Sequence, residues 1–182
     1  AVVAPTQLQR EMFYSIGGGT AVTDLTSSAK YPGKPDALVA LNSFSTATDI
    51  ADNYGSRVRG FLVPSISGDY QFLIASDDAS QLKLSSDSNA ANATIIATVP
   101  GWTSANEWTK YTNQTSALIT NLQAGTRYYI EALQKEGGGG DNLSVAWIEP
   151  GSGVTNVIPG ANLQPLDINF APQLNAQAFS VF

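Results

Sequence analysis

The sequence predicts an all-β fold, an antiparallel β-sandwich with long loops, on three observations. Short runs rich in β-branched and aromatic residues recur along the chain, turn residues separate them, and no stretch sustains a helical hydrophobic period. Many short strands with this spacing are typical of an antiparallel sandwich or barrel.

The expected strands follow one another from residue 57 to residue 149. In chain order they span 57–63, 70–75, 81–85, 94–99, 116–122, 127–134 and 143–149. The segments between them, such as "PSISGD" and "SSDSNAAN", are rich in the residues that favour turns. The best helical candidate, residues 36–44, is short and weakly periodic.

The character of the chain changes after Pro150, so we expect two parts. Residues 1–150 are predicted to form the sandwich, and residues 151–182 a linker rich in Gly, Pro and Asn. Near the end, "NFAPQLNAQAFSV" resembles the first strand of cadherin-like repeats in bacterial surface proteins. The resemblance implies a monomeric module cut from a longer tandem-repeat protein.

Composition excludes several classes of function. The 182-residue chain has a net charge of −6 and only nine Lys and Arg, which argues against a nucleic-acid partner. It has no Cys and no His, which removes thiolate and histidine metal sites and the histidine-dependent catalytic triads. A metal must therefore be held by oxygen, which favours calcium or magnesium. The sequence contains no run of 18 apolar residues, so no membrane insertion is expected, and no signal peptide is visible at the start.

Two adjacent carboxylates, Asp77 and Asp78, follow the strand at 70–75 in the stretch "SDDAS". Successive side chains in a strand point to opposite faces, so the two should diverge unless the strand end turns both towards one point. Carboxylates that converge repel each other, and a cation is needed to hold them together.

A run of four glycines, Gly137 to Gly140, precedes Asp141 between the last two expected strands. It could be a flexible hairpin connection. It could also turn the carbonyl oxygens of Gly138, Gly139 and Gly140 towards a cation, with Asp141 adding a carboxylate, because calcium takes six to eight oxygen ligands. The residues alone leave both interpretations open.

From Arg10 to Pro150 the sequence resembles the anthrax-protective-antigen (PA-fourteen) domain family. The matching stretches are "REMFYSIGGGTAVTDL", "YGSRVRGFLVPSISGDYQFLIASDDASQLKLS", "GWTSANEWTKYTNQTS" and "AGTRYYIEALQKEGGGGDNLSVAWIEPG". The family is a β-sandwich module of bacterial adhesins, yeast flocculins and some glycosidases. In its lectin members the paired Asp forms a cis peptide that binds calcium, a second loop completes the shell, and calcium binds vicinal sugar hydroxyls directly.

The resemblance implies an extracellular, cell-surface lectin module that needs Ca²⁺ and binds glycans with vicinal hydroxyls, of the fucose or hexose class. It implies the metal ligands Asp77, Asp78, Gly138–Gly140 and Asp141. In yeast members an Asn side chain of the second loop ligates the metal, so the choice between Asp141 and Asn142 stays open.

Three tryptophans are candidate platforms for a sugar ring. Trp147 alternates with Val145 and Leu143 and is expected in the core, whereas Trp102 and Trp108 lie in a long loop. The predicted sugar-binding set is Asp77, Asp78, Asp141 and Trp102.

A glycosidase also uses paired carboxylates, but these lie roughly 5–9.5 Å apart on separate elements across the scissile bond. Asp77 and Asp78, adjacent in one loop, fit a shared cation better. We therefore expect a binding module without catalytic activity. The alternative is a structural spacer, or an accessory module of a glycoside hydrolase.

Overall fold

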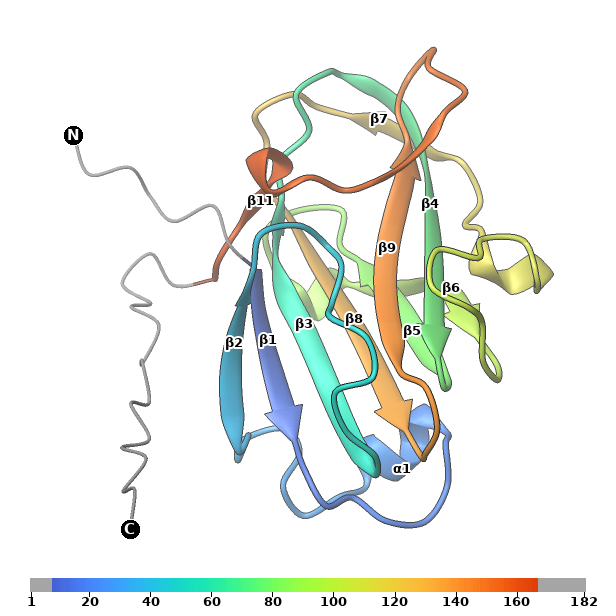
Figure 1. The fold of residues 1–182 in the computed structure, drawn as a ribbon. Helices are drawn as coiled ribbons and strands as arrows, with labels where there is room; N and C mark the ends of the chain where they lie inside the picture. The colour runs from blue at the N-terminus through green and yellow to red at the C-terminus, as the bar shows by residue number, and fades with distance from the viewer. Residues whose placement is uncertain (1–7, 167–182) are drawn as a thin grey trace, which may run out of the picture.

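A computed structural model of the chain describes residues 8–166, which form two antiparallel sheets packed face to face (Figure 1). The larger sheet runs in the order β2-β1-β3-β8-β5-β6, with β11 paired to β3. Its strands are β1 (Leu8–Phe13), β2 (Ala37–Leu41), β3 (Tyr54–Leu62), β5 (Ser80–Leu84), β6 (Thr94–Val99), β8 (Tyr128–Glu136) and β11 (Leu163–Gln164). The smaller sheet runs β10-β9-β4-β7, with β4 (Gly68–Asp77), β7 (Ile119–Leu122), β9 (Asn142–Ile148) and β10 (Thr155–Val157). The predicted fold class is confirmed.

Helical structure is limited to short segments. They are α1 (Val22–Thr26) and the 3-10 helices η1 (Ala90–Asn92), η2 (Thr112–Gln114) and η3 (Gly160–Asn162). In residues 8–166, none of these helices is long and apolar enough to cross a membrane. The candidate helix at 36–44 is wrong: β2 lies there as an edge strand paired with β1, because ladder hydrogen bonds to a neighbouring strand outweigh a weak local preference.

The core lies between the two sheets and is built from alternate residues of the strands. Tyr70, Phe72 and Ile74 of β4 are fully buried on one face, as the alternation predicts. Trp147 of β9 is 1% exposed, and its ring centroid lies 5.0 Å from that of Tyr70. The expectation that Trp147 belongs to the core is confirmed.

Strand pairing continues beyond Pro150, within the segment expected to be a linker. β10 pairs with β9 and β11 pairs with β3. Ile158 and Leu163 are fully buried in the core. These apolar side chains hold the segment against the sandwich, although its sequence lacks the alternating pattern of a strand. The stretch that resembles a cadherin-like strand lies outside the described residues.

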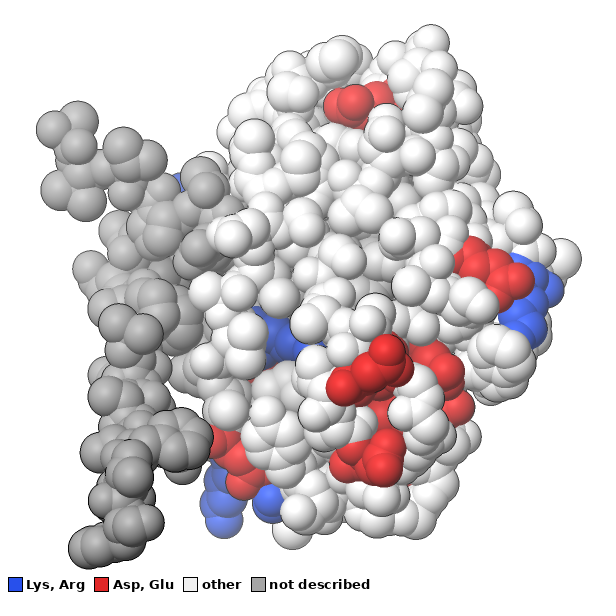
Figure 2. Space-filling model, viewed as in Figure 1, with Lys and Arg blue, Asp and Glu red and all other residues white. Residues whose placement is uncertain are grey.

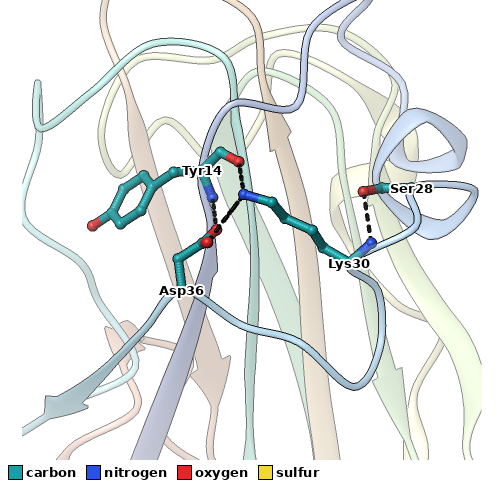
Figure 3. A network of polar contacts seen from close by, with 4 residues as sticks. All are labelled: Tyr14, Ser28, Lys30 and Asp36. Carbon is teal, nitrogen blue, oxygen red and sulfur yellow. Dashed lines mark hydrogen bonds and ion pairs between the residues drawn. The ribbon is translucent and has the colours of Figure 1, made fainter.

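The long connection from β1 to β2 covers one end of β8. Leu25 of α1 packs with Phe13, Ile16 and Leu133 in a small second core. The connection closes through an exposed polar network in which Lys30 Nζ donates to the Tyr14 carbonyl at 2.7 Å and to Asp36 at 2.8 Å, while Tyr14 N donates to Asp36 at 2.7 Å (Figure 3). The connection from β1 to β2 is therefore held in place beside the end of β8, where the candidate site lies.

Candidate functional site

Asp77 and Asp78 lie where β4 turns into β5, and the peptide bond between them is cis, as the resemblance implied. Three partly buried hydrogen bonds fix this turn. The Gln134 side-chain amide donates to the Asp77 carbonyl, the Ser76 hydroxyl donates to the Asp78 carbonyl at 2.6 Å, and Gly137 N donates to Asp78 Oδ2 at 3.1 Å. The adjacent carboxylates are thus held in place by β8 and by the start of the glycine loop.

A third carboxylate, which the sequence did not single out as a ligand, joins this pair. Glu136 is the last residue of β8, and one oxygen from each of Asp77, Asp78 and Glu136 lies within 4.8 Å of the others. Glu136 is fully buried, and neither of its carboxylate oxygens has a hydrogen-bond partner. Asp77 and Asp78 are partly exposed.

The glycine-rich connection between β8 and β9 lies beside these carboxylates. Gly139 has φ of 109°, a conformation that glycine adopts readily, and its N–H donates to Asp52 Oδ1 at 3.2 Å. The carbonyls of Gly137 and Asp141 accept hydrogen bonds from Asn53 N and Asp49 N. The carbonyls of Gly138, Gly139 and Gly140 remain as the backbone oxygens that this loop can offer to a ligand.

Asp141 and Asn142 each use one side-chain atom to hold neighbouring loops and keep one buried oxygen without a partner. Asp141 Oδ2 accepts from Ile50 N at 2.8 Å and from Ala51 N at 3.1 Å, whereas its Oδ1 is buried without a partner. The Asn142 amide donates to the Thr103 carbonyl at 2.9 Å, and its Oδ1 is also buried without a partner. Both candidates for the second-loop ligand therefore present a free oxygen.

The loop from residue 42 to residue 53 brings two further carboxylates, Asp49 and Asp52, which the sequence analysis missed. A Cβ built on Gly140 would lie 3.3 Å from Asp49 Oδ1 and 3.8 Å from Asp77 Oδ2, so both carboxylates flank this glycine. Figure 2 shows a patch of acidic side chains at the end of the molecule where α1 lies. No strand periodicity marks this loop; the only sequence signal was its content of acidic and turn residues.

A cavity of about 330 Å³ opens beside the carboxylates. Its lining includes Asp77, Asp141 and Trp102, so the structure brings these three predicted residues to one place. Trp102 is 51% exposed, and Lys110 Nζ lies 3.0 Å from its ring centroid. Trp108 is half-buried and is not part of the lining.

The loop that carries Trp102 is tied to the strand that carries Asp77. Thr103 N donates to the Ser76 carbonyl at 2.7 Å, and Ser76 N donates to the Thr103 hydroxyl at 2.9 Å. These bonds are buried, so the ring and the carboxylates keep a fixed relation.

Burial and mutual repulsion perturb two of the carboxyl groups. Burial, then the charge of Asp78, raises the pKa of Asp77 to about 6, although Lys110 counteracts part of this. Burial, then the charges of Asp78, Asp77 and Asp141, raises the pKa of Glu136 to about 7, against a smaller lowering by the Asp78 backbone. Both shifts indicate a site that favours an added positive charge.

The donor set fits a hard divalent cation. Glu136 contributes two buried oxygens without partners beside the Asp77–Asp78 pair. Asp141 and Asn142 each have one such oxygen and line the cavity with Asp77, but Asp141 is not part of the cluster of three carboxylates. Buried polar atoms are nearly always paired, and a cation bound between Asp77, Asp78 and Glu136 would pair the Glu136 carboxylate. Calcium prefers carboxylate and carbonyl oxygens of this kind.

The fold and the site together define a class: a β-sandwich domain that gathers carboxylates and an exposed tryptophan at the ends of its strands. The chain belongs to the PA14 domain family, whose sequence profile matches residues 33–160.

Known proteins share the sequence or the fold to different extents. A mouse N-acetyl-beta-glucosaminyl-glycoprotein 4-beta-N-acetylgalactosaminyltransferase 1 is 36% identical over 134 residues, which is 71% of this chain and 13% of the mouse protein. The PA14 sugar-binding domain from an RTX adhesin superposes with a TM-score of 0.64 at 16% identity, over 87% of this chain and 98% of that one. The epithelial adhesin 6 A domain from Candida glabrata, solved with Galβ1-3GlcNAc, gives 0.60 at 12% identity, over 92% and 90% of the two chains.

Proposed function

We propose that this domain is a calcium-dependent carbohydrate-binding module of a cell-surface adhesin. The observation that carries the proposal is the cluster of Asp77, Asp78 and Glu136, with its unpartnered buried oxygens, beside a cavity bordered by Trp102. A PA14 sugar-binding domain and an adhesin domain solved with a glycan share this fold, which supports the same use of it here.

In this mechanism Asp77, Asp78, the glycine carbonyls and Asp141 would hold the cation at the strand ends. Calcium, when bound, supplies coordination positions for two neighbouring hydroxyls of a fucose or hexose. Trp102 offers an apolar ring face against which the sugar can pack. The hydrogen bonds between Thr103 and Ser76 fix the separation between the ring and the carboxylates, so orientation of the sugar is set before it binds.

The geometry favours binding over hydrolysis. Glycosidases place an acid and a base or nucleophile roughly 5–9.5 Å apart on either side of the scissile bond. Here one oxygen from each of Asp77, Asp78 and Glu136 lies within 4.8 Å of the others, and of these three residues only Asp77 lines the cavity. We therefore propose a non-catalytic module, one part of a longer extracellular protein.

A glycan array screened with calcium and again with a chelator tests the proposal. We expect signals for glycans with vicinal hydroxyls that disappear with chelator. Absence of signal in both screens would indicate a structural spacer, and release of reducing ends from the glycans would indicate a glycosidase. A signal that survives chelation would contradict the calcium-dependent mechanism.

A further inference from the structure

We propose that Glu136 is a further ligand of the cation, one that binds it from inside the sandwich and sets its affinity. This rests on the proposed function, because it concerns the same cation. Glu136 is the last residue of β8, and one of its oxygens lies within 4.8 Å of oxygens of both Asp77 and Asp78.

The other buried glutamates show how this protein satisfies such a group. Glu11 is bound by Arg57 and Arg59, and Glu131 accepts from Lys83 Nζ at 3.1 Å and from the Tyr129 hydroxyl at 2.7 Å. Glu136 is equally inaccessible, yet no side chain and no positively charged group pairs with either of its oxygens. Burial of a carboxylate without such a partner costs free energy. A bound cation would offset this cost, whereas packing alone would not.

The nearest lysine does not supply that partner. Lys135 is buried as well, but its Nζ donates to the backbone carbonyl of Glu136 and not to the carboxylate. Adjacent residues of a strand point to opposite faces, which places the two side chains on different sides of β8. Among residues 8–166 no ion pair involves Glu136.

The burial of the three carboxylates differs in a way that divides their tasks. Asp77 lines the cavity and is partly exposed, whereas Glu136 is fully buried and does not line it. Glu136 therefore contacts the cation but not the sugar. Its loss should weaken cation binding directly, and sugar binding only as far as the site loses its cation.

The test is Glu136→Gln, which keeps the shape of the side chain and removes its charge. Terbium serves as the probe, because tryptophan near the site sensitises its luminescence, and calcium is then titrated in competition. We expect the apparent Kd for both cations to rise by about 10-fold or more, the scale of well-placed groups around a metal. Glu131→Gln, a buried glutamate of the same strand that has its own partners, is the matched control and should bind as the parent does.

Thermal melts at pH 8 separate a ligand from a merely structural residue. In chelator, Glu136→Gln should melt at or above the parent, because a buried unpaired charge is removed. In calcium it should melt below the parent, because its gain from the cation is smaller. A structural glutamate would instead lower the midpoint equally in both buffers.

The outcomes distinguish a failure of this inference from a failure of the proposed function. Unchanged cation affinity in Glu136→Gln, with a parent that binds, overturns this inference and leaves the proposed function standing. A parent that binds neither terbium nor calcium overturns both. Should Glu136→Gln fail to fold, Glu136→Asp, which keeps the charge but withdraws it by one methylene, is expected to weaken cation binding, and normal binding by that variant would overturn the inference.

Discussion

Replacement of Asp141 separates two tasks that the structure gives to its two carboxylate oxygens. Oδ2 accepts from Ile50 N at 2.8 Å and from Ala51 N at 3.1 Å, which holds the loop at residues 42–53 against β9. Oδ1 is buried without a partner and is free to bind the cation. Alanine removes both oxygens, whereas asparagine keeps one acceptor and loses the charge.

The expected loss of stability follows from the two hydrogen bonds. A hydrogen bond to a charged group contributes about 1.5–3 kcal/mol, and we take the lower end because Ile50 is 43% exposed and its amide can be rehydrated. Asp141→Ala should therefore lower the free energy of unfolding by about 3 kcal/mol. For a domain of this size, about 2–4 °C per kcal/mol gives a fall of about 6–12 °C in the melting midpoint. Asp141→Asn should lose only about 1 kcal/mol, since neutral hydrogen bonds remain.

Calorimetry in chelator measures the contribution of the two hydrogen bonds to Asp141 Oδ2. A calcium titration measures the contribution of Oδ1 to cation binding. Asp52→Ala is the control, because it loses one exposed hydrogen bond of 3.2 Å from Gly139 N and should change stability by less than about 1 kcal/mol. Both Asp141 variants should lose calcium affinity. If Asp141→Ala and the parent have the same melting midpoint in chelator, the two hydrogen bonds to Oδ2 do not stabilise the fold as argued. If Asp141→Asn binds calcium as the parent does, Asp141 is not a charged ligand.

Four further outcomes are expected. Calcium at 100 times its Kd should stabilise the parent by about 2.7 kcal/mol, so melting curves that coincide in calcium and chelator would contradict an accessible site. Asp78→Ala should abolish sugar binding with a cooperative melt retained, while Asp87→Ala, in a turn after β5, should bind sugar normally. Trp102→Ala should weaken sugar binding by about 10-fold while calcium affinity stays unchanged, as expected for loss of a ring contact of about 1.5 kcal/mol. Finally, the raised pKa values of Asp77 (about 6) and Glu136 (about 7) mean that the folded, metal-free protein holds protons that the unfolded chain has released. Its stability in chelator should therefore fall as pH rises from 5 to 8, and calorimetry should find a shallower fall in Glu136→Gln.

The strands from β3 to β9 could be predicted from the sequence because each carries its own alternation. The run around Tyr70 and Phe72 is an example: the same period that places these rings on one face also predicts the core. β2, β10 and β11 lack such a signal, since they lie at sheet edges or contribute two or three residues. They form because partners far along the chain offer unpaired backbone groups, and a local pattern does not report those partners.

The candidate site was predictable only in part, for a similar reason. The unusual pairs and runs, Asp77–Asp78 and the glycines before Asp141, stand out by composition. Glu136 does not, because its burial depends on β4, β8 and the β8–β9 connection meeting at one end of the sandwich. Gln134, whose amide binds the carbonyls of Asp77 and Asn142, is equally inconspicuous in sequence and belongs to the same meeting point.

The two sides of the site are held by different means, and this bears on which side determines the ligand. The carboxylate side is fixed by partly buried hydrogen bonds from Gln134 and Ser76 at the strand ends. The opposite side is formed by residues 49–52 and 138–141, which are loops joined by a few bonds, among them those of Asp141. Replacement of Gln134 or Ser76 would disturb the frame between the sheets as well as the site, whereas loop positions whose side chains make no such bonds tolerate change more readily. Cation binding should therefore depend on the strand ends together with Asp141, and the choice among sugars on the other loop residues that line the cavity, such as Thr48 and Asp49.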